Sequence, residues 1–228
     1  MLKERSSEQE IMDDLDISGP VVSQTLRELN TINRTLGGNQ ISISAFDKVT
    51  TGLDQFVLVD LGCGGGDIMV GMAKRARKHN KKGSFVGIDA NPNIVEYAKK
   101  NTAAYPEVTY QSKNIFSEEF RKMKFDLIHC CLFLHHFTNE QLIELFKQFK
   151  TQANVGIIIN DLHRHPLAYW SIKVLTFLFS KSSMVRNDAA VSVARGFKKT
   201  ELLMILKEAG ITHFELKWKW AFRWQLTF

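Results

Sequence analysis

Short apolar runs alternate with amphipathic stretches through the middle of the chain. The runs begin at Val57, Ser84, Val108, Phe125 and Val155, and each has the length of a β-strand rather than of a helix. The run from Val155 is apolar throughout, as expected for a parallel strand that is buried on both faces. The stretches between the runs have helical spacing. This alternation predicts an α/β fold with a doubly wound, mostly parallel sheet.

The two ends of the chain follow other patterns. Residues 200–209 have helical spacing, and residues 211–228 alternate apolar and polar side chains with a period of two. We therefore expect a last helix and an antiparallel strand pair that closes the sheet. The first 50 residues are polar and helical in pattern. The sequence predicts a helical cap over residues 1–50 and one sheet-based domain over residues 51–228.

The first apolar run ends in a glycine-rich turn, Asp60-Leu61-Gly62-Cys63-Gly64-Gly65-Gly66-Asp67, and helical spacing follows at once. A strand, a tight turn and a helix N-terminus form a recurrent binding place for nucleotide-like ligands in α/β sheets. The dinucleotide fingerprint G-x-G-x-x-G/A is absent because Asp67 stands where the third small residue belongs. No Gly-Lys-Ser/Thr follows, which excludes a P-loop. The turn therefore indicates a different ligand.

The spacing Asp60-x-Gly62-x-Gly64-x-Gly66 resembles the first motif of the class I S-adenosylmethionine (SAM)-dependent methyltransferases. The resemblance implies a Rossmann-like, seven-stranded sheet, SAM as the cofactor and S-adenosylhomocysteine as the product. Glycines let the backbone approach the amino-acid end of SAM, where a side chain would collide. The implied cofactor-binding residues are Asp60, Gly62, Cys63, Gly64, Gly66, Asp89, Ala90, Asn114, Ile115 and Cys131.

Two of these residues have a second interpretation. Asp89 ends the second run, where the resemblance implies a hydrogen bond to the ribose hydroxyls. Asn91-Pro92 then opens a helix, so Asp89 is alternatively a capping carboxylate. Asn114 stands where the family usually carries an Asp that receives the adenine amino group, and its amide offers a carbonyl oxygen for the same bond. A surface turn is the alternative for Asn114.

The fourth run leads into Leu134-His135-His136-Phe137, which resembles the ubiquinone/menaquinone-type branch of the family. Branches that methylate amino groups carry N-P-P-Y or D-P-P-Y at this place, and this chain does not. Transfer to a phenol or enol is helped by a base, and histidine, with a pKa of about 6.5, suits that task. His136 or His135 is the candidate catalytic base, with a structural or capping role as the alternative.

Residues 163–197 interrupt the expected step from the fifth strand to the next helix, a place where methyltransferases vary their substrate specificity. The surrounding sequence resembles the bacterial methyltransferases that accompany type III polyketide synthases. We expect a helix that lines an apolar substrate pocket, with His163, His165, Tyr169 and Arg186 as substrate residues. Peripheral contact of this helix with a membrane or a dimer partner stays open. Its apolar run is too short to span a bilayer.

Charge and composition narrow the partners. The net charge is +6, but the lysines are spread over helix ends, so no nucleic-acid partner is expected. Arg164, Arg186 and Arg195 are candidates to pair with an acidic or phenolate group of the substrate, or structurally with Asp188. The histidines have Asp161 as their one nearby carboxylate, so no metal site is expected.

The cysteines and the amino terminus bear on location. The three cysteines form neither a disulfide framework nor a CxxC site, and no signal-peptide pattern is seen. Both observations favour a reducing, cytoplasmic compartment.

Together the patterns predict a SAM-dependent methyltransferase that acts on a small, apolar acceptor of phenolic, quinol or polyketide type. Oxygen is favoured over carbon as the methylated atom. The alternatives are an RNA or protein methyltransferase and a SAM-binding protein without catalysis. The chain is expected to be a monomer or a homodimer.

Overall fold

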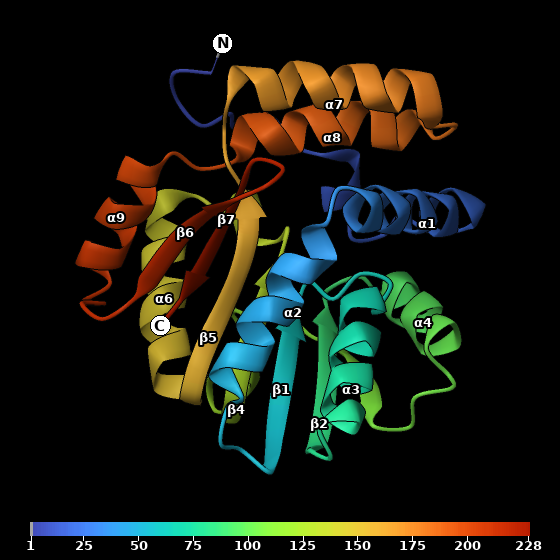
Figure 1. Ribbon diagram of the computed structural model, residues 1–228. Helices are drawn as coiled ribbons and strands as arrows, with labels where there is room; N and C mark the ends of the chain where they lie inside the picture. Colours follow the sequence, from blue (N-terminus) through green and yellow to red (C-terminus); the bar gives the residue numbers. More distant parts are fainter. Residues whose placement is uncertain (1) are drawn as a thin grey trace.

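One mixed sheet forms the centre of the molecule. The computed structural model describes residues 2–228, and within them seven strands are ordered β3-β2-β1-β4-β5-β7-β6 (Figure 1). The strands are β1 Gln55–Leu61, β2 Lys82–Asp89, β3 Val108–Ser112, β4 Phe125–Cys131, β5 Ala153–Leu162, β6 Glu215–Lys219 and β7 Arg223–Thr227. The first five pair in parallel, whereas β7 lies antiparallel between β5 and β6. The predicted doubly wound sheet with an antiparallel carboxyl-terminal pair is confirmed.

Helices cover both faces of this sheet and its upper edge. The α-helices are α1 Pro20–Thr35, α2 Gly38–Val49, α3 Asp67–Lys78, α4 Pro92–Asn101, α5 Glu118–Arg121, α6 Asn139–Gln152, α7 Pro166–Phe179, α8 Ser183–Arg195 and α9 Lys199–Glu208. Two short 3-10 helices are η1 Ile11–Asp13 and η2 Leu134–His136.

Alternating side chains of the buried strands supply two core layers. On β1, Leu58 packs with Phe46 of α2 and Met72 of α3, whereas the next residue, Val59, packs on the opposite face with Phe146 of α6. Successive strand residues point to opposite faces, so a continuous apolar run fills both layers. Helix α2 therefore belongs to the core layer of the sheet rather than to a cap.

Helix starts follow the strand ends because capping side chains stand there. Asn91 accepts a hydrogen bond from the backbone N–H of Asn93, with Pro92 at the first helical position of α4. Thr138 caps α6 by accepting from the backbone N–H of Gln141. These caps place the N-termini of both helices near the carboxyl edge of the sheet, where α/β folds bind ligands.

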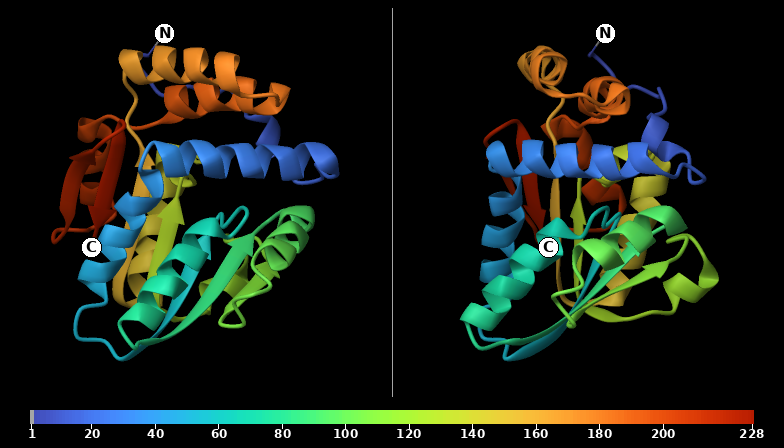
Figure 2. Two further views of the ribbon diagram at one scale, coloured as in Figure 1. Left: turned by 45° about the vertical axis from the view of Figure 1, so that its right-hand side comes forward. Right: turned by 90° about the vertical axis from the view of Figure 1, so that its right-hand side faces the viewer.

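Three helices lie above that edge. In Figures 1 and 2, α1 crosses over the carboxyl ends of the strands, α8 lies above it and α7 is outermost. Residues 2–17, which we call the amino-terminal strap, reach α8, where the backbone N–H of Ser6 donates to the carbonyl of Ala194. The strap and α1 are thus the parts of the first 50 residues that lie over the sheet edge.

Helix α7 differs from the prediction. It was expected to line an apolar pocket, yet Ala168 and Thr176 are its buried residues and most of its large apolar side chains are exposed. The apolar run predicted the helix correctly but not the side on which its apolar residues lie. No helix among residues 2–228 combines the length and apolar content needed to cross a membrane.

Candidate active site

The glycine turn after β1 presents bare backbone to the sheet edge. Gly62, Gly64 and Gly66 have φ values of +66°, +50° and +77°, a left-handed conformation that side chains disfavour. A Cβ at Gly62 would lie 2.2 Å from the ring of Phe133, so the protein's own packing demands a glycine there. A Cβ at Gly64 would meet nothing nearer than Leu26 of α1, at 3.6 Å. Gly64 therefore leaves open backbone between the turn and α1.

Asp60, at the end of β1, is buried and takes part in a hydrogen-bonded chain. Its Oδ1 lies 2.6 Å from Nδ1 of His129 on β4, and Nε2 of His129 lies 2.9 Å from Oγ of Ser42 on α2. The β1–β4 register places Asp60 opposite His129. The second carboxylate oxygen, Oδ2, forms no hydrogen bond with residues 2–228 and is the oxygen left for a ligand.

Asp89, at the end of β2, is tied to the same turn. Its Oδ1 accepts from the backbone N–H of Asn91 at 3.0 Å. Burial raises the pKa of Asp89, and hydrogen bonds from the backbone N–H groups of Asn91 and Gly64 oppose that rise. Asn91, not Asp89, caps α4. Asn91 therefore takes the capping role that was the alternative for Asp89. Asp89 itself is the last residue of β2, beside the end of β1.

The other predicted cofactor residues also lie at or next to strand ends. Cys63 belongs to the glycine turn and Ala90 follows β2, while Cys131 ends β4 with its Sγ 4.0 Å from Nδ2 of Asn33. Asn114 is exposed, and its Oδ1 accepts from the backbone N–H of Phe116 at 2.9 Å, which closes a local turn.

Asn114 thus forms the surface turn that was the alternative to adenine binding. The neighbouring Ile115 is buried. The structure therefore gathers these residues along one edge without showing which of them contact a ligand.

An unusual turn carries the chain from β4 into η2. Leu132 has a φ of +53°, which is uncommon for a residue with a side chain and recurs at functional sites. Asp161, at the end of β5, accepts from the backbone N–H groups of Phe133, Leu134 and His135 at 3.2, 2.8 and 3.3 Å. The sequence had suggested Asp161 only as a possible metal ligand. In the structure its carboxylate binds the backbone N–H groups at the amino end of η2.

His135 lies between two carboxylates and is almost completely buried. Its Nδ1 is 2.7 Å from Oδ1 of Asp161, and its Nε2 is 3.4 Å from Oε1 of Glu10 in the strap. Burial lowers the pKa of His135, but the two carboxylates outweigh it and raise the pKa to about 9. Burial raises the pKa of Asp161, but the charge of His135 and the hydrogen bonds from His135 and the backbone N–H of Leu162 together outweigh it and lower the pKa to about 2. A charged, enclosed imidazolium has no lone pair to accept a proton, so the predicted role as a base does not suit His135.

His136 has the arrangement of a base. Its side chain is 22% exposed, and its Nδ1 lies 2.5 Å from Oδ1 of Asp13. Its Nε2 forms no hydrogen bond with residues 2–228, so an imidazole that donates from Nδ1 keeps a lone pair on Nε2. Of the two predicted histidines, His136 is the more exposed, with 22% of its side chain accessible against 2% for His135.

Two arginines hold the carboxyl end of η2. Arg195 of α8 donates to the carbonyls of His135 and His136 at 3.2 and 2.7 Å and to Oδ2 of Asp13 at 2.6 Å. Arg5 of the strap donates to the carbonyls of His135 and Phe137. Cations at this end and Asp161 at the other satisfy the free backbone groups of η2. Arg195 was predicted to pair with an acidic or phenolate group of the substrate or with Asp188, but its partner in the structure is Asp13.

The strap acids also bear on metal binding. Glu10, His135 and His136 present ligand atoms within 4.8 Å of one another, a spacing that suits a metal ion. Arg195 Nη1, however, lies 3.6 Å from Oε1 of Glu10, and Asp13 takes the Nδ1 of His136. A guanidinium at that distance repels a cation. The group therefore suits a hydrogen-bonded charge network better than a metal centre.

The four predicted substrate residues do not form one pocket. His165 caps the start of α7, where its Nδ1 accepts from the backbone N–H of Leu167, and His163 nearby accepts from the indole N–H of Trp218. Tyr169 lies one turn further on, under the ammonium of Lys173.

Arg186 lies at the opposite end of α7, where it donates to the carbonyl of Ser180. Arg164, which was grouped with it, forms a buried ion pair with Glu201. Asp188, their proposed structural partner, instead accepts from the backbone N–H groups of Ile11 and Met12. These polar groups fasten α7, α8 and the strap, and they give no support to a substrate-binding role.

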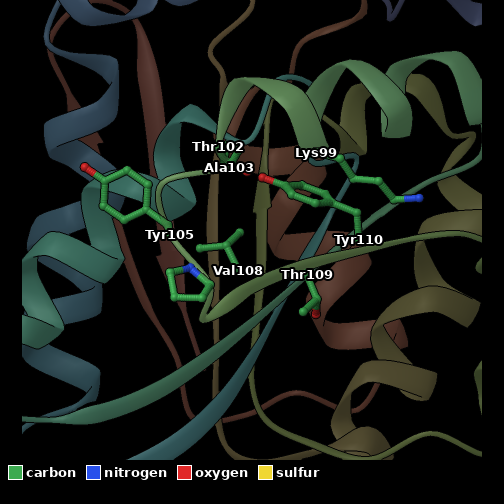
Figure 3. Close-up of a pocket in the computed structure, with 8 residues that line it drawn as sticks. Lys99, Thr102, Ala103, Tyr105, Val108, Thr109 and Tyr110 are labelled. Atoms are coloured by element: carbon green, nitrogen blue, oxygen red, sulfur yellow. The ribbon is translucent and has the colours of Figure 1, made fainter.

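A surface hollow of about 330 Å³ lies between the end of α4 and β3 (Figure 3). Its lining includes Thr102 and Tyr105, which follow α4, and Val108, at the start of β3. Neither Asp60 nor Asp89 belongs to it. Two of its lining residues, Thr102 and Tyr110, pack against Gly66, so the hollow adjoins the glycine turn without including the two carboxylates.

The fold and the turn define a class of protein that comparisons with known proteins identify. A family model described as a methyltransferase domain matches residues 58–180, more than half of the chain. The chain belongs to this family. An uncharacterized methyltransferase of the cyanobacterium Synechocystis sp. is 32% identical over 109 residues, which are 47% of each protein. The match thus covers about half of the full length of this curated relative.

Solved structures share the fold. Human N-acetylserotonin methyltransferase in complex with SAM has a TM-score of 0.64 and 19% identity, with 90% of this chain and 55% of that one covered. A SAM-dependent methyltransferase from Aquifex aeolicus has a TM-score of 0.63 and 16% identity, with 90% and 96% covered. The plantazolicin methyltransferase BpumL, in complex with S-adenosylhomocysteine, has a TM-score of 0.63 and 18% identity, with 87% and 79% covered.

The residues at the sheet edge fit the SAM cofactor of this class. Gly64 offers backbone that no side chain of its own covers, and Asp60 and Asp89 end the two strands on either side of the turn. A carboxylate at the end of the second strand suits ribose hydroxyls. The chain thus has the family, the fold and the glycine turn of a methyltransferase domain.

Proposed function

We propose that this methyltransferase transfers the methyl group of SAM to the hydroxyl oxygen of a small, apolar, aromatic acceptor, with His136 as the general base. The pair of Asp13 and His136 carries this proposal. A histidine that donates from Nδ1 to a carboxylate is held in the tautomer whose Nε2 accepts a proton. Asp13 lies 2.5 Å from Nδ1 of His136, which meets that requirement.

The aromatic side chains around η2 support an apolar acceptor. The ring of Phe137 lies 5.0 Å from that of Phe133 and 5.5 Å from that of Phe116, both in edge-on contact. All three are partly exposed at the carboxyl edge of the sheet. Edge-on aromatic groups favour contact with another ring. A flat, aromatic acceptor against these rings would lie next to His136.

The chain's residues would divide the work as follows. Asp89 and the glycine turn bind the cofactor, whereas Asp60 provides Oδ2 for its amino group. SAM, when bound, supplies an activated methyl group and leaves as S-adenosylhomocysteine. His136 Nε2 accepts the proton of the acceptor hydroxyl, and Asp13 stabilises the imidazolium that results. Asp161, Arg5 and Arg195 hold η2, so that His136 stays in place.

The proposal is tested by methyl transfer from labelled SAM to a panel of phenols, quinols and phenolic polyketides. The panel also includes acceptors whose hydroxyl group is already O-methylated, so that only a ring carbon can accept the labelled methyl group. Label in the hydroxyl position supports the proposal, and label on ring carbon would replace oxygen with carbon as the acceptor atom. The resemblance to the quinone-type and polyketide-associated branches sets the choice of this panel.

Two alternatives are separated by the same label. Incubation with cell lysate, followed by separation into RNA, protein and small molecules, shows which fraction gains the methyl group. Label in RNA or protein would overturn the small-molecule assignment. SAM affinity without transfer to any fraction would indicate a SAM-binding protein without catalysis.

A further inference from the structure

One face of α7 exposes large apolar side chains that no other part of residues 2–228 covers. Leu167, Trp170, Val174, Phe177, Leu178 and Phe179 are between 57% and 79% exposed. The first four recur at intervals of three or four residues and Leu178 follows Val174 by four, so these five lie on one side of the helix, with Phe179 at its carboxyl end. Helix α7 packs against α8 and is the outermost layer of the molecule (Figure 2). We call these six residues the α7 face.

A second apolar projection lies beside the start of α7. The tip of the β6–β7 hairpin carries Trp220, which is 69% exposed, and Phe222. The ring of Phe222 stacks on that of His165, the cap of α7, at 5.1 Å. Monomeric proteins rarely expose continuous apolar patches of this size without a partner. Trp is enriched where one side of a surface is apolar and the other is wet.

The charged side chains of the segment that carries the α7 face are all basic. Residues 162–187 contain no Asp or Glu, whereas Lys173, Lys181 and Arg186 lie in this segment and are exposed. The ammonium of Lys173 lies 5.3 Å from the centre of the Trp170 ring, and the guanidinium of Arg186 lies 5.8 Å from that of Phe177. Basic groups are therefore placed directly among the apolar ones.

Two acids lie near this segment. Glu28 of α1 accepts from the hydroxyl of Ser180 and the backbone N–H of Lys181 and places one negative charge at the carboxyl end of α7, whereas Asp188 is buried against the strap. The three exposed basic groups outnumber the one carboxylate at this surface. An isologous dimer through the α7 face would bring the same basic side chains of two copies together. A surface of anionic lipid offers both an apolar interior and negative charge.

We propose that the α7 face and the hairpin tip dock this methyltransferase on an anionic membrane surface. Helix α7 would lie in the plane of the interface, with its apolar side chains among the acyl chains and its basic groups at the headgroups. The helix is about 21 Å long at 1.5 Å per residue, so it lies along the surface and does not cross it. Docking does not depend on the acceptor, but it would place the sheet edge beside a pool of lipid-soluble molecules.

Sedimentation with vesicles tests the docking. One vesicle preparation contains phosphatidylcholine alone, and the other contains phosphatidylcholine mixed with phosphatidylglycerol. We expect the protein to bind the mixed vesicles and to bind the neutral ones far more weakly. The combined substitution Phe177→Ser, Leu178→Ser and Phe179→Ser should reduce binding about tenfold or more, because it removes three apolar anchors. Lys173→Glu with Lys181→Glu should abolish the preference for anionic lipid.

A matched control uses apolar residues on another helix. Leu203 and Met204 of α9 are exposed by 38% and 41%, and their combined replacement by Ser should leave vesicle binding unchanged. All substituted side chains are exposed, so circular dichroism should show intact folding. Absence of binding to either vesicle, or equal binding by the α7 variant and the wild type, would overturn the proposal.

The oligomeric state separates a bilayer from a second copy. If the protein without lipid sediments as a dimer and the α7 variant as a monomer, a second copy covers the face and the membrane assignment is wrong. A monomer that binds anionic vesicles supports it. The assay contains neither SAM nor acceptor, so its outcome is independent of the proposed methyl transfer.

Discussion

Asp13 and His136 are 123 residues apart in the chain, yet Asp13 Oδ1 lies 2.5 Å from His136 Nδ1. Asp13 belongs to the amino-terminal strap and His136 to the turn after β4. The pKa of Asp13 is lowered because hydrogen bonds from His136 and Arg195 outweigh its partial burial. A carboxylate that stays ionised is the partner that orients an imidazole as a base.

Replacement of His136 should therefore reduce turnover without removing the cofactor. We expect His136→Gln to lower kcat by about 100-fold or more, the usual contribution of a general base. Asp13→Asn should lower kcat by about tenfold and shift the pH profile of kcat, because the tautomer is less well held. The affinity for SAM, measured by calorimetry, should stay within about twofold for both variants.

The neighbouring Asp14 provides the control for Asp13. Its exposed carboxylate accepts from the backbone N–H of Asp16 and contacts neither histidine. Asp14→Asn should leave kcat unchanged. Full activity of the His136→Gln variant would remove His136 from the mechanism.

Asp89 should govern cofactor binding. We expect Asp89→Asn to weaken SAM and S-adenosylhomocysteine at least about tenfold, because an amide cannot replace both acceptor oxygens toward the ribose. The substitution keeps a carbonyl oxygen for the N–H of Asn91, so the turn stays folded. Asp54, exposed at the opposite end of β1, provides the control, and Asp54→Asn should not change the dissociation constant in calorimetry. Equal affinity of the Asp89 variant and the wild type would contradict this assignment.

The pair of His135 and Asp161 should make stability depend on pH. The pKa of His135 is raised from 6.5 to about 9, so its contribution is full below pH 6.5 and is lost as the pH rises through about 9. The pKa of Asp161 is lowered from 3.8 to about 2, so its contribution is present above pH 3.8 and is lost as the pH falls through about 2. We expect the denaturant midpoint to fall between pH 7 and pH 10.

A variant separates His135 from other groups that titrate at alkaline pH. His135→Asn keeps a donor for Asp161 but cannot titrate, so its alkaline fall should be smaller than that of the wild type. The difference is a few kcal/mol at most. Hydrogen exchange of residues 5–13 should rise over the same range, because Glu10 loses its charged partner. Identical pH curves for variant and wild type would show that His135 is not the titrating group.

Gly62 should be more sensitive to substitution than another left-handed glycine. Gly52 has a φ of +80° and free space around it, so Gly52→Ala should cost about 1–2 kcal/mol of unfolding free energy from backbone strain alone. Gly62→Ala adds a Cβ that would lie 2.2 Å from Phe133, and it should cost about 1–3 kcal/mol more. Chemical denaturation measures both. Equal losses would mean that Phe133 moves aside freely.

The sheet and the cofactor turn could be predicted because their signals are local. Apolar runs of strand length give the positions of the strands along the chain, and the glycines between Asp60 and Asp67 indicate a ligand-binding turn at that place. The hydrogen bond between Asp60 and His129 could not be foreseen, because it depends on the pairing of β1 with β4. The role of Asp161 likewise requires β5 to lie beside β4.

The partners of the strap and the exposed side of α7 could not be predicted from the sequence, for different reasons. Glu10 and Asp13 lie in an acidic stretch of a kind that is usually solvated surface. Nothing in the local sequence indicates that their partners are His135 and His136, more than 120 residues away. An apolar helical run has the same pattern whether it faces a pocket or the outside, so the burial of α7 could not be known. The predicted substrate residues lie near the two ends of α7 rather than together.

The strap has a consequence for synthesis of the protein. Its residues are synthesised before Arg195 and Ala194, to which they bind. The strap therefore cannot complete its contacts until α8 has been made. The bond that Arg195 donates to Asp13, the partner of the proposed base His136, comes from a residue 182 positions later in the chain.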